Sequence, residues 1–429
     1  MKDLLNISGT SIVVALNDRA YAILDCNSEK KQLVELLPST SQSGQKTGKT
    51  SQPNSIQAVS CRWNEHKQVL LCAVSRQDKH VSVYSLSLNN VETSQVEPIV
   101  IHKTNKRSCS LAFAEIPFED KCKGSLDILV TADLAGDVQA FPTDALQPKA
   151  HRLLLGHTAS MLTAMKISNG KIFTADRDEK IRISSFPSTF EVEGYLLGHR
   201  EYVTDMDLFG EDHKYCVSSS GDCSIRLWDT DKCIELANIN VSPQEDEEIT
   251  SDDENPANGN LMQIPVRLDV SKKNGNLAVI YHGKSCVDLF SLSSNGTSVQ
   301  KLQSIECVNP LAIAFNSNDE VCVLTKEPYF FARFAKNVDG VYAELKGCEI
   351  SRAIREKGGQ NQAIMPTSVM EVDEVTGRFK LMKNIHDERE TYVEHKPWLR
   401  GKERIQKLKD KERRRKRKKR ENEGGDVEK

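Results

Sequence analysis

The sequence predicts an all-β protein, a seven-bladed β-propeller of the WD-repeat type. Two Gly-His dipeptides, Gly156-His157 and Gly198-His199, begin equivalent segments, and the run Leu227-Trp228-Asp229 ends a strand-like stretch after the second of them. A Gly-His followed some twenty-odd residues later by a Trp-Asp is the signature of one four-stranded blade. An aromatic content of 6% and an apolar fraction of 38% indicate that part of the chain lies outside such a core.

The number of blades follows from a short strand of alternating polarity that recurs along the chain. The steps from Phe141 to Ser184 and from Ser184 to Trp228, 43 and 44 residues, match the length of one blade. Longer steps elsewhere require insertions. We expect the propeller to occupy residues 1–385. The seven occurrences of the strand end at Ile23, Tyr84, Phe141, Ser184, Trp228, Phe290 and Phe331.

Two segments of the propeller have the composition of disordered insertions. Residues 38–54 are a Ser/Thr/Gln/Gly tract with almost no apolar side chains, and residues 242–260 carry two acidic runs. Neither segment can bury enough apolar surface to offset the entropy of ordering it. The acidic insertion is either a solvated loop that can be phosphorylated or an intramolecular cover for basic residues elsewhere, and the sequence leaves both interpretations open.

The charge of the chain is divided between an acidic body and a basic tail. Residues 1–399 carry a net charge of −11, whereas residues 400–420 hold fourteen Lys or Arg against three Asp or Glu. We expect residues 386–400 to be a linker or a docking segment. Residues 401–429 form the basic tail, which we expect to be partly helical, more so in the presence of a polyanion that relieves the repulsion between like charges.

The densest cationic run of this tail suits two compatible roles. As a nuclear-localisation signal it places the protein in the nucleus, with the cytoplasm as a second location. As an RNA contact it neutralises phosphates without reading bases, since no aromatic side chains are interleaved with the charges. The run consists of Arg413, Arg414, Arg415, Lys416, Arg417, Lys418, Lys419 and Arg420.

The repeat that ends in Trp-Asp predicts a buried polar network. Its strands alternate around a tight turn at Gly221-Asp222, as in a hairpin. Blades of this type bury a His, an Asp, a Ser or Thr and a Trp indole that satisfy one another, because unpaired polar groups are costly inside a protein. We expect a structural role for the members, which are His199, Asp222, Ser218 or Ser220, and Trp228.

The preceding repeat lacks one member of this network. His157 and Asp178 occupy the positions of the first two members, but Ser184 stands in place of the Trp. We expect His157 and Asp178 to have the same structural role as their counterparts. The absence of the indole leaves this blade without one of its usual internal contacts.

One strand of the same repeat offers two cations on one face. Side chains alternate along a strand, so Lys180 and Arg182 point to one side, about 7 Å apart. Ile181 and Ile183 point to the other side. Arg182 has a counterpart in Arg226 of the next repeat, which leaves open whether it is only a common feature of these repeats.

A specific resemblance rests on the nine residues from Asp176 to Ser184, which read Asp-Arg-Asp-Glu-Lys-Ile-Arg-Ile-Ser and lie between the two Gly-His dipeptides. This segment resembles the WD-repeat, non-catalytic subunit of the tRNA 7-methylguanosine methyltransferase, a family that includes the Wuho proteins of insects. The close resemblance covers residues 150–230 and, in outline, most of the propeller.

The resemblance implies a partner and a division of labour. The chain would bind and stabilise a separate catalytic methyltransferase subunit in a heterodimer. That subunit would hold S-adenosylmethionine and modify a guanosine in tRNA, and this chain would carry no cofactor and meet tRNA through the complex. By the same resemblance Lys180 and Arg182 face acidic residues of the partner, with Arg177 and Glu179 nearby.

The sequence shows no pattern typical of a catalytic or metal site. It has no G-x-G-x-x-G after a strand, no P-loop and no C-x-x-C pair among its twelve cysteines, several of which sit in β-rich runs as small buried residues. No apolar run is long enough to cross a membrane. The alternative function is a scaffold or a ubiquitin-ligase substrate adaptor. Adaptors often carry Arg two positions after Trp-Asp, where this chain has Asp231.

Overall fold

The computed structural model describes residues 4–9, 11–16, 18–24, 32–38, 55–87, 94–117, 125–144, 152–157, 162–241, 263–293, 296–325, 331–345, 352 and 354. The chain divides into two units, Met1–Val369 and Met370–Lys429, and all described residues belong to the first. The predicted insertions beyond Pro38, the segment 386–400 and the basic tail lie outside the described residues. Within the described part, no helix is long and apolar enough to span a bilayer.

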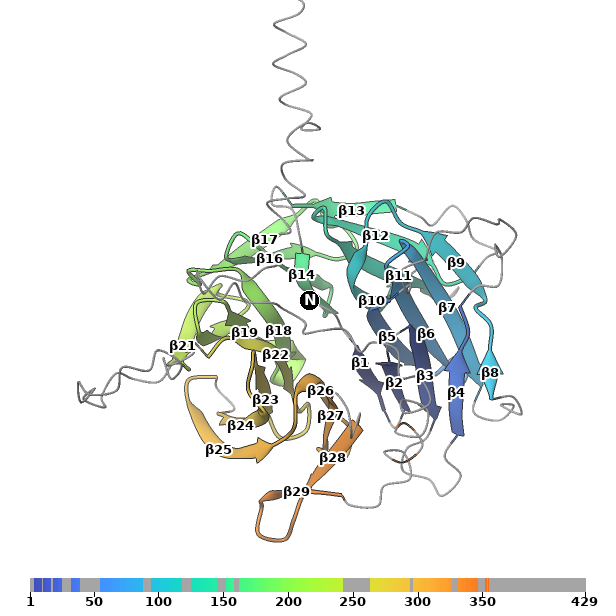
Figure 1. Ribbon diagram of the computed structural model, residues 1–429. Helices are drawn as coiled ribbons and strands as arrows, with labels where there is room; N and C mark the ends of the chain where they lie inside the picture. Colours follow the sequence, from blue (N-terminus) through green and yellow to red (C-terminus); the bar gives the residue numbers. More distant parts are fainter. Residues whose placement is uncertain are drawn as a thin grey trace, which may run out of the picture. The chain divides into compact units, whose positions relative to one another are not determined.

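The described residues form seven sheets of antiparallel strands, which confirms the predicted seven-bladed β-propeller (Figure 1). Blade 1 consists of β1 (Leu5–Ser8), β2 (Ser11–Leu16), β3 (Arg19–Leu24) and β4 (Gln32–Leu36), and the short β8 (Gln95–Val96) pairs parallel with β4. Blade 2 consists of β5 (Ile56–Asn64), β6 (Val69–Arg76), β7 (His80–Ser87) and β9 (Val100–Lys103). Blade 3 consists of β10 (Ser108–Pro117), β11 (Ser125–Asp133), β12 (Asp137–Pro142) and β13 (Arg152–Gly156).

The other four blades are each built from four consecutive strands. Blade 4 consists of β14 (Leu162–Ser168), β15 (Lys171–Asp176), β16 (Lys180–Ser185) and β17 (Val192–Leu197). Blade 5 consists of β18 (Val203–Phe209), β19 (Tyr215–Ser220), β20 (Ser224–Asp229) and β21 (Ile234–Asn240), with the 3₁₀ helix η3 (Glu211–His213) after β18. Blade 6 consists of β22 (Pro265–Val270), β23 (Asn276–Tyr281), β24 (Cys286–Leu292) and β25 (Val299–Glu306). Blade 7 consists of β26 (Pro310–Phe315), β27 (Val321–Thr325), β28 (Phe331–Lys336) and β29 (Tyr342–Glu344).

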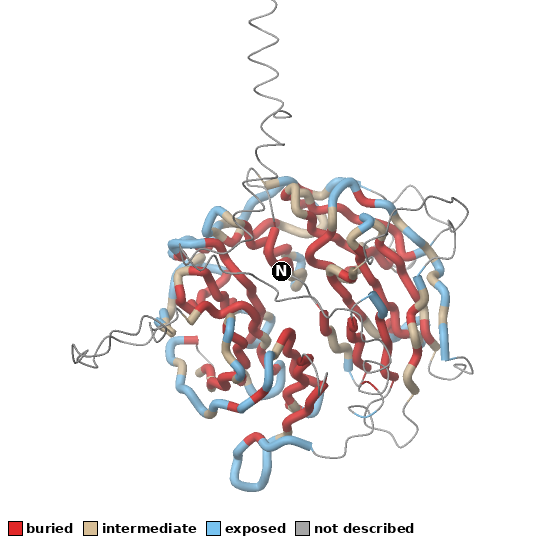
Figure 2. Tube along the Cα trace, viewed as in Figure 1, coloured by how far each residue is buried: buried red, intermediate tan, exposed pale blue. Residues whose placement is uncertain are grey.

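The first strand of each blade lies nearest to the centre and packs against the first strand of the next blade. β26 of blade 7 packs in the same way against β1 of blade 1, which closes the ring. The second and third strands are almost completely buried because neighbouring blades cover both of their faces (Figure 2). The fourth strands of blades 2 to 6 are largely exposed and form the rim.

The repeat assignment made from the sequence agrees with this architecture. All seven predicted endpoints lie on the third strand of a blade. Ser184 and Trp228 occupy equivalent positions, because Ser184 pairs with Ile172 of β15 and Trp228 pairs with Cys216 of β19. The indole of Trp228 is completely buried between blades 4 and 5.

Most of the described cysteines are core residues, as predicted. Cys72, Cys216 and Cys322 are completely buried in second strands, whereas Cys286 at the start of β24 is half-buried. Burial raises the pKa of the Cys72 and Cys216 thiols well above the usual range. These thiols therefore stay protonated and unreactive at neutral pH.

Polar side chains of the inner strands connect neighbouring blades along the central channel. Asp205 and Asp207 of β18 accept hydrogen bonds from the backbone N–H groups of Leu268 (3.2 Å) and Val270 (3.1 Å) of β22. Asp269 of β22 accepts one from Phe315 N–H of β26 at 2.7 Å. Each bond satisfies a backbone donor that faces the channel, so the carboxylates tie blade 5 to blade 6 and blade 6 to blade 7.

Two lysines compensate the charge of Asp207 in this channel. The ammonium groups of Lys166 and Lys272 lie 3.1 and 2.8 Å from its carboxylate oxygens. Burial opposes ionisation of Asp207, but the two lysine charges outweigh it and hold the pKa of Asp207 well below its usual value. Burial and the charge of Asp207 raise the pKa of the neighbouring Asp269 to about 7.

Candidate partner interface

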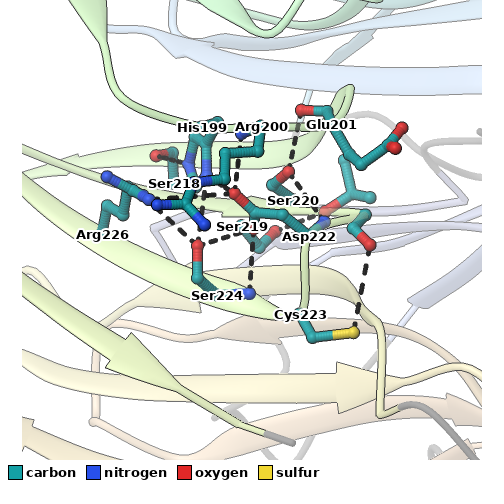
Figure 3. A network of polar contacts seen from close by, with 12 residues as sticks. His199, Arg200, Glu201, Ser218, Ser219, Ser220, Asp222, Cys223, Ser224 and Arg226 are labelled. Atoms are coloured by element: carbon teal, nitrogen blue, oxygen red, sulfur yellow. Dashed lines mark hydrogen bonds and ion pairs between the residues drawn. The ribbon is translucent and has the colours of Figure 1, made fainter.

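The predicted polar network is present in blade 5 (Figure 3). His199 Nδ1 lies 3.1 Å from Asp222 Oδ2, and His199 Nε2 lies 2.8 Å from Ser218 Oγ. Trp228 Nε1 donates to the same Ser218 oxygen at 2.8 Å. These contacts form one consistent chain, in which the indole donates to the serine, the serine donates to the histidine, and the histidine donates to the carboxylate.

The alternative serine has another partner. Ser220 Oγ donates to the carbonyl oxygen of Glu201 at 2.9 Å and accepts from the backbone N–H of Asp222 at 3.1 Å. It therefore shapes the turn before β20, and Ser218 is the network member. Burial opposes ionisation of Asp222, but hydrogen bonds from His199 and Ser224 outweigh it and hold the pKa of Asp222 well below its usual value.

The packing of blade 5 also explains why position 198 is a glycine. A Cβ on Gly198 would lie 2.7 Å from Nη1 of Arg226 and 3.0 Å from the Trp228 ring. Any larger residue would push the guanidinium and the indole away. The Gly-His signature therefore combines a close approach of backbone to indole with the histidine of the network.

The structure corrects the expected partner of His157 in blade 4. Its Nδ1 lies 2.8 Å from Asp176 Oδ2 and its Nε2 lies 2.7 Å from Thr174 Oγ1. The carboxylate of Asp178 is exposed and does not take part. Thr174 and Asp176 lie two residues apart on β15, so both side chains face the histidine, whereas Asp178 lies in the turn beyond the strand.

The difference between the two blades has a simple origin. Position 176 carries a carboxylate. The equivalent position of blade 5 is Ser220, which is uncharged and donates its hydrogen bond to Glu201. In blade 5 the aspartate of the turn therefore turns inward and supplies the acceptor. Asp176 was visible in the nine-residue motif, and the alternation along its strand was the signal that identifies it.

Blade 4 replaces the missing indole with contacts of Arg182. Its Nε donates to Ser184 Oγ at 2.9 Å, its Nη1 lies 3.4 Å from the carbonyl oxygen of Gly156, and its Nη2 lies 3.3 Å from that of Thr189. Gly156 ends β13 of blade 3, and Thr189 precedes β17. The guanidinium therefore connects blade 4 to blade 3. The contact with Thr189 could not be foreseen from the sequence.

Arg182 differs from its counterpart in blade 5 in one important respect. Arg226 forms ion pairs with Glu235 and, at 3.9 Å, with Asp222. All three acceptors of Arg182 are neutral, and it forms no ion pair with any described residue. Part of the reason lies on the outer strand, where Glu235 pairs with Trp228 but Val192 pairs with Ser184. Blade 4 therefore retains a positive charge that blade 5 neutralises.

Lys180 adds a second positive charge on the same face. Its side chain is half-buried, and among the described residues its ammonium group makes neither a hydrogen bond nor an ion pair. Ile181 and Ile183 are completely buried on the opposite face, as the alternation predicts.

The two flanking residues differ in their exposure. Arg177 is largely buried, with 15% of its side chain exposed, and lies 3.8 Å from Asp178. Glu179 is exposed in the turn, where its φ of 69° places it in the left-handed region. Lys180 and Arg182 are therefore the two uncompensated cations of this strand, and their contact with another protein stays a prediction.

Sequence comparisons identify relatives of the region that includes β16. Residues 143–328 match the sequence model of the tRNA methyltransferase TRM82 WD40 domain. The predicted family resemblance is confirmed for this region. It contains blades 4 to 6 and the first two strands of blade 7, and therefore both uncompensated cations.

Individual relatives carry the same description. The chain is 32% identical over 175 residues to the tRNA (guanine-N(7)-)-methyltransferase non-catalytic subunit wuho of Drosophila ananassae, covering 41% of this chain and 38% of that protein. It is 33% identical over 163 residues to the Drosophila melanogaster protein of that name, covering 38% and 34%. The Aedes aegypti protein is 30% identical over 195 residues, covering 44% and 45%. The chain thus matches less than half the length of each of these relatives.

Solved structures agree with the fold alone. The WD40 β-propeller domain of Doa1 superposes with a TM-score of 0.52 at 14% identity, covering 79% of this chain and 94% of that one. The WD40 domain of Toxoplasma gondii coronin superposes with a TM-score of 0.53 at 13% identity, covering 77% and 80%.

Proposed function

We propose that this chain is the non-catalytic WD40 subunit of a tRNA (guanine-N7-)-methyltransferase. Its function is to bind a separate catalytic subunit and to stabilise it in a heterodimer. The match of residues 143–328 to the TRM82 WD40 domain supports this proposal, as do the relatives described as non-catalytic subunits of the same enzyme.

The observation that carries the proposal is the uncompensated charge on β16. Lys180 and Arg182 point to one face of blade 4, and neither forms an ion pair with a described residue, whereas the equivalent Arg226 does. The fold does not require such charges, since blade 5 neutralises its equivalent Arg226 with Glu235 and Asp222. Carboxylates of a partner would complete both pairs, and charge pairs that become desolvated at an interface contribute strongly to affinity and to the choice of partner.

The chemistry of the reaction belongs to the partner in this proposal. The catalytic subunit binds S-adenosylmethionine and methylates N7 of a guanosine in tRNA, and this chain carries no cofactor. tRNA meets the propeller through the complex. A propeller with rigid, mutually satisfied blades suits this role, because it can hold a docking surface in place without moving during the reaction.

The basic tail adds targeting or RNA attraction in the same proposal. The run from Arg413 to Arg420 lies outside the described residues, and its roles rest on its charge. A cationic run of this density is typical of nuclear targeting, and it also attracts tRNA without reading its bases. Deleting residues 401–429 separates the two, because one role changes the nuclear fraction and the other changes RNA affinity at low salt.

Two measurements test the main proposal. The full chain is purified from its source under mild conditions, and a methyltransferase in near-stoichiometric amount is the expected companion. The 7-methylguanosine content of bulk tRNA is then measured after depletion of the chain, and a loss of this nucleoside is expected. An unchanged 7-methylguanosine content, or recovery of a ubiquitin-ligase linker protein in place of a methyltransferase, would show that the propeller serves as a scaffold or adaptor.

A further inference from the structure

Large apolar side chains lie exposed directly beside the two cations of blade 4. Tyr195 and Leu197 belong to β17, the rim strand of this blade, and their exposed fractions are 40% and 66%. In the register of the two strands Lys180 pairs with Leu197, and Arg182 pairs with Tyr195. Directly paired residues of neighbouring strands point to the same face, with Cβ atoms about 5 Å apart.

These four residues, Lys180, Arg182, Tyr195 and Leu197, form one surface, which we call the β16–β17 patch. Two cations lie about 7 Å apart along β16, and two apolar side chains lie beside them along β17. Both strands are held in a regular sheet, so the four side chains keep a fixed spacing.

The equivalent positions of blades 5 and 6 have a different character. In blade 5, Ser224 pairs with Asn240 and Arg226 pairs with Asn238, which places polar side chains on the rim strand. In blade 6, Cys286 pairs with Glu306, and Asp288 with Ser304. Exposed apolar residues next to cations are therefore a feature of blade 4 and not a requirement of the fold.

One more exposed apolar residue lies in the connection between β16 and β17. Phe190, 81% exposed, follows Thr189, whose carbonyl accepts from Arg182 and whose hydroxyl donates to the carbonyl oxygen of Leu154 in β13. The connection that carries Phe190 is thus tied to both blades, and it extends the patch without being part of its centre.

We propose that the β16–β17 patch is the docking surface for the catalytic methyltransferase subunit and that its apolar row supplies binding energy that the cations alone do not. This inference rests on the proposed function. The matching surface of the partner is an amphipathic segment that presents carboxylates opposite Lys180 and Arg182 and apolar side chains opposite Tyr195 and Leu197. Apolar anchors with charged groups beside them are the usual composition of a specific protein interface.

The composition of the patch favours a protein over RNA as its occupant. A phosphate backbone would match the two cations, but it offers nothing to the exposed leucine, and that leucine lies directly across from Lys180. Scattered apolar residues on a surface are ordinary, whereas a cluster that adjoins uncompensated charges is typical of a site covered by another protein.

The test compares three variants of the full chain for binding to the purified catalytic subunit by calorimetry, at about 50 mM and about 500 mM NaCl. The Y195S/L197S double variant removes the apolar row, and K180A removes one charge. The I234S/L302S variant alters exposed apolar residues on the rim strands of blades 5 and 6 and serves as the matched control. The thermal midpoint of each variant is measured to confirm that it is folded.

We expect Y195S/L197S to raise Kd by at least about tenfold at both salt concentrations, because contacts between apolar groups are not screened. K180A should raise Kd mainly at low salt, and I234S/L302S should bind like the wild type. Wild-type affinity of Y195S/L197S, with K180A weakened, would overturn this inference and leave the proposed function intact. Failure of the wild type to bind the catalytic subunit would overturn both. Loss of tRNA affinity by Y195S/L197S without loss of subunit binding would assign the patch to RNA and overturn the inference as well.

Discussion

Arg182 donates a hydrogen bond of 2.9 Å to Ser184 at the position where the next blade carries the indole of Trp228. A serine is much smaller than an indole, and the guanidinium supplies contacts to blade 3 and to Thr189 in its place. Because all three acceptors are neutral, Arg182 connects blade 4 to blade 3 and keeps its positive charge near the rim.

The first prediction concerns Lys180, whose ammonium group makes neither a hydrogen bond nor an ion pair with a described residue. Replacing it with Glu should leave the fold intact, since its side chain contributes no described polar contact. The same change should weaken binding of the catalytic subunit by at least about 2 kcal/mol, because a like charge then faces the partner's carboxylates. The matched control is K103E, at an exposed lysine at the end of β9. Calorimetric titration measures both, and equal affinities for K180E and K103E would place the interface elsewhere.

The second prediction separates the structural role of Arg182 from its charge. R182A should destabilise the protein by about 1–2 kcal/mol, because contacts to Ser184, Gly156 and Thr189 are lost. R182K keeps the charge, but its single nitrogen cannot reach the three acceptors that three nitrogens of the guanidinium contact, so it should lose similar stability while retaining more partner affinity than R182A. Urea unfolding monitored by tryptophan fluorescence gives the stability. A midpoint for R182A equal to that of the wild type would mean that these contacts do not stabilise the pair of blades.

The propeller and the network of blade 5 could be predicted from the sequence because their signals are local and repeated. The spacing from Gly198-His199 to Trp228 identifies the blade, and the turn at Gly221-Asp222 places the carboxylate near the histidine. The same counting failed for Asp178. Two carboxylates, at positions 176 and 178, were available, and His157 contacts Asp176, which lies on β15 two residues after Thr174, whereas Asp178 lies in the turn beyond the strand.

Neither the contacts of Arg182 nor the apolar row of β17 could be predicted from the spacing of the repeats. Thr189 lies in a connection between strands, and its approach to Arg182 depends on how that connection folds over blade 3. Tyr195 and Leu197 did carry a signal, since a rim strand is expected to be mostly polar. That signal indicates a patch only once the strand register is known, because the register places these residues opposite Arg182 and Lys180.

The third prediction tests the buried network of blade 5. S218A removes the hydroxyl oxygen that joins His199 and Trp228. The indole N–H of Trp228 and Nε2 of His199 then both lack that partner. We expect a loss of about 1–3 kcal/mol in the free energy of unfolding, since both groups stay buried. S298A, at an exposed serine before β25, is the control and should change stability by less than about 0.5 kcal/mol. Denaturant titrations compare the two, and a similarly small effect at Ser218 would contradict the proposed role of the network in stability.

The last prediction follows from the carboxylates of the central channel. The pKa of Asp269 is raised to about 7 by burial and by the charge of Asp207, compared with about 4 in an unfolded chain. The folded state therefore binds this proton more tightly, so the stabilising contribution is full below about pH 4 and is lost as the pH rises to about 7. D269N does not titrate and keeps an acceptor for Phe315 N–H.

The free energy of unfolding of the wild type should therefore fall relative to that of D269N by about 2 kcal/mol between about pH 5 and about pH 8, a value that allows for screening by water in the channel. Urea unfolding at several pH values measures this difference, with D339N, at an exposed aspartate before β29, as the control. The control should follow the wild type at every pH. If the difference between the wild type and D269N did not change with pH, the proton on Asp269 would be bound no more tightly in the folded protein than in the unfolded chain, and the charge of Asp207 would not reach it.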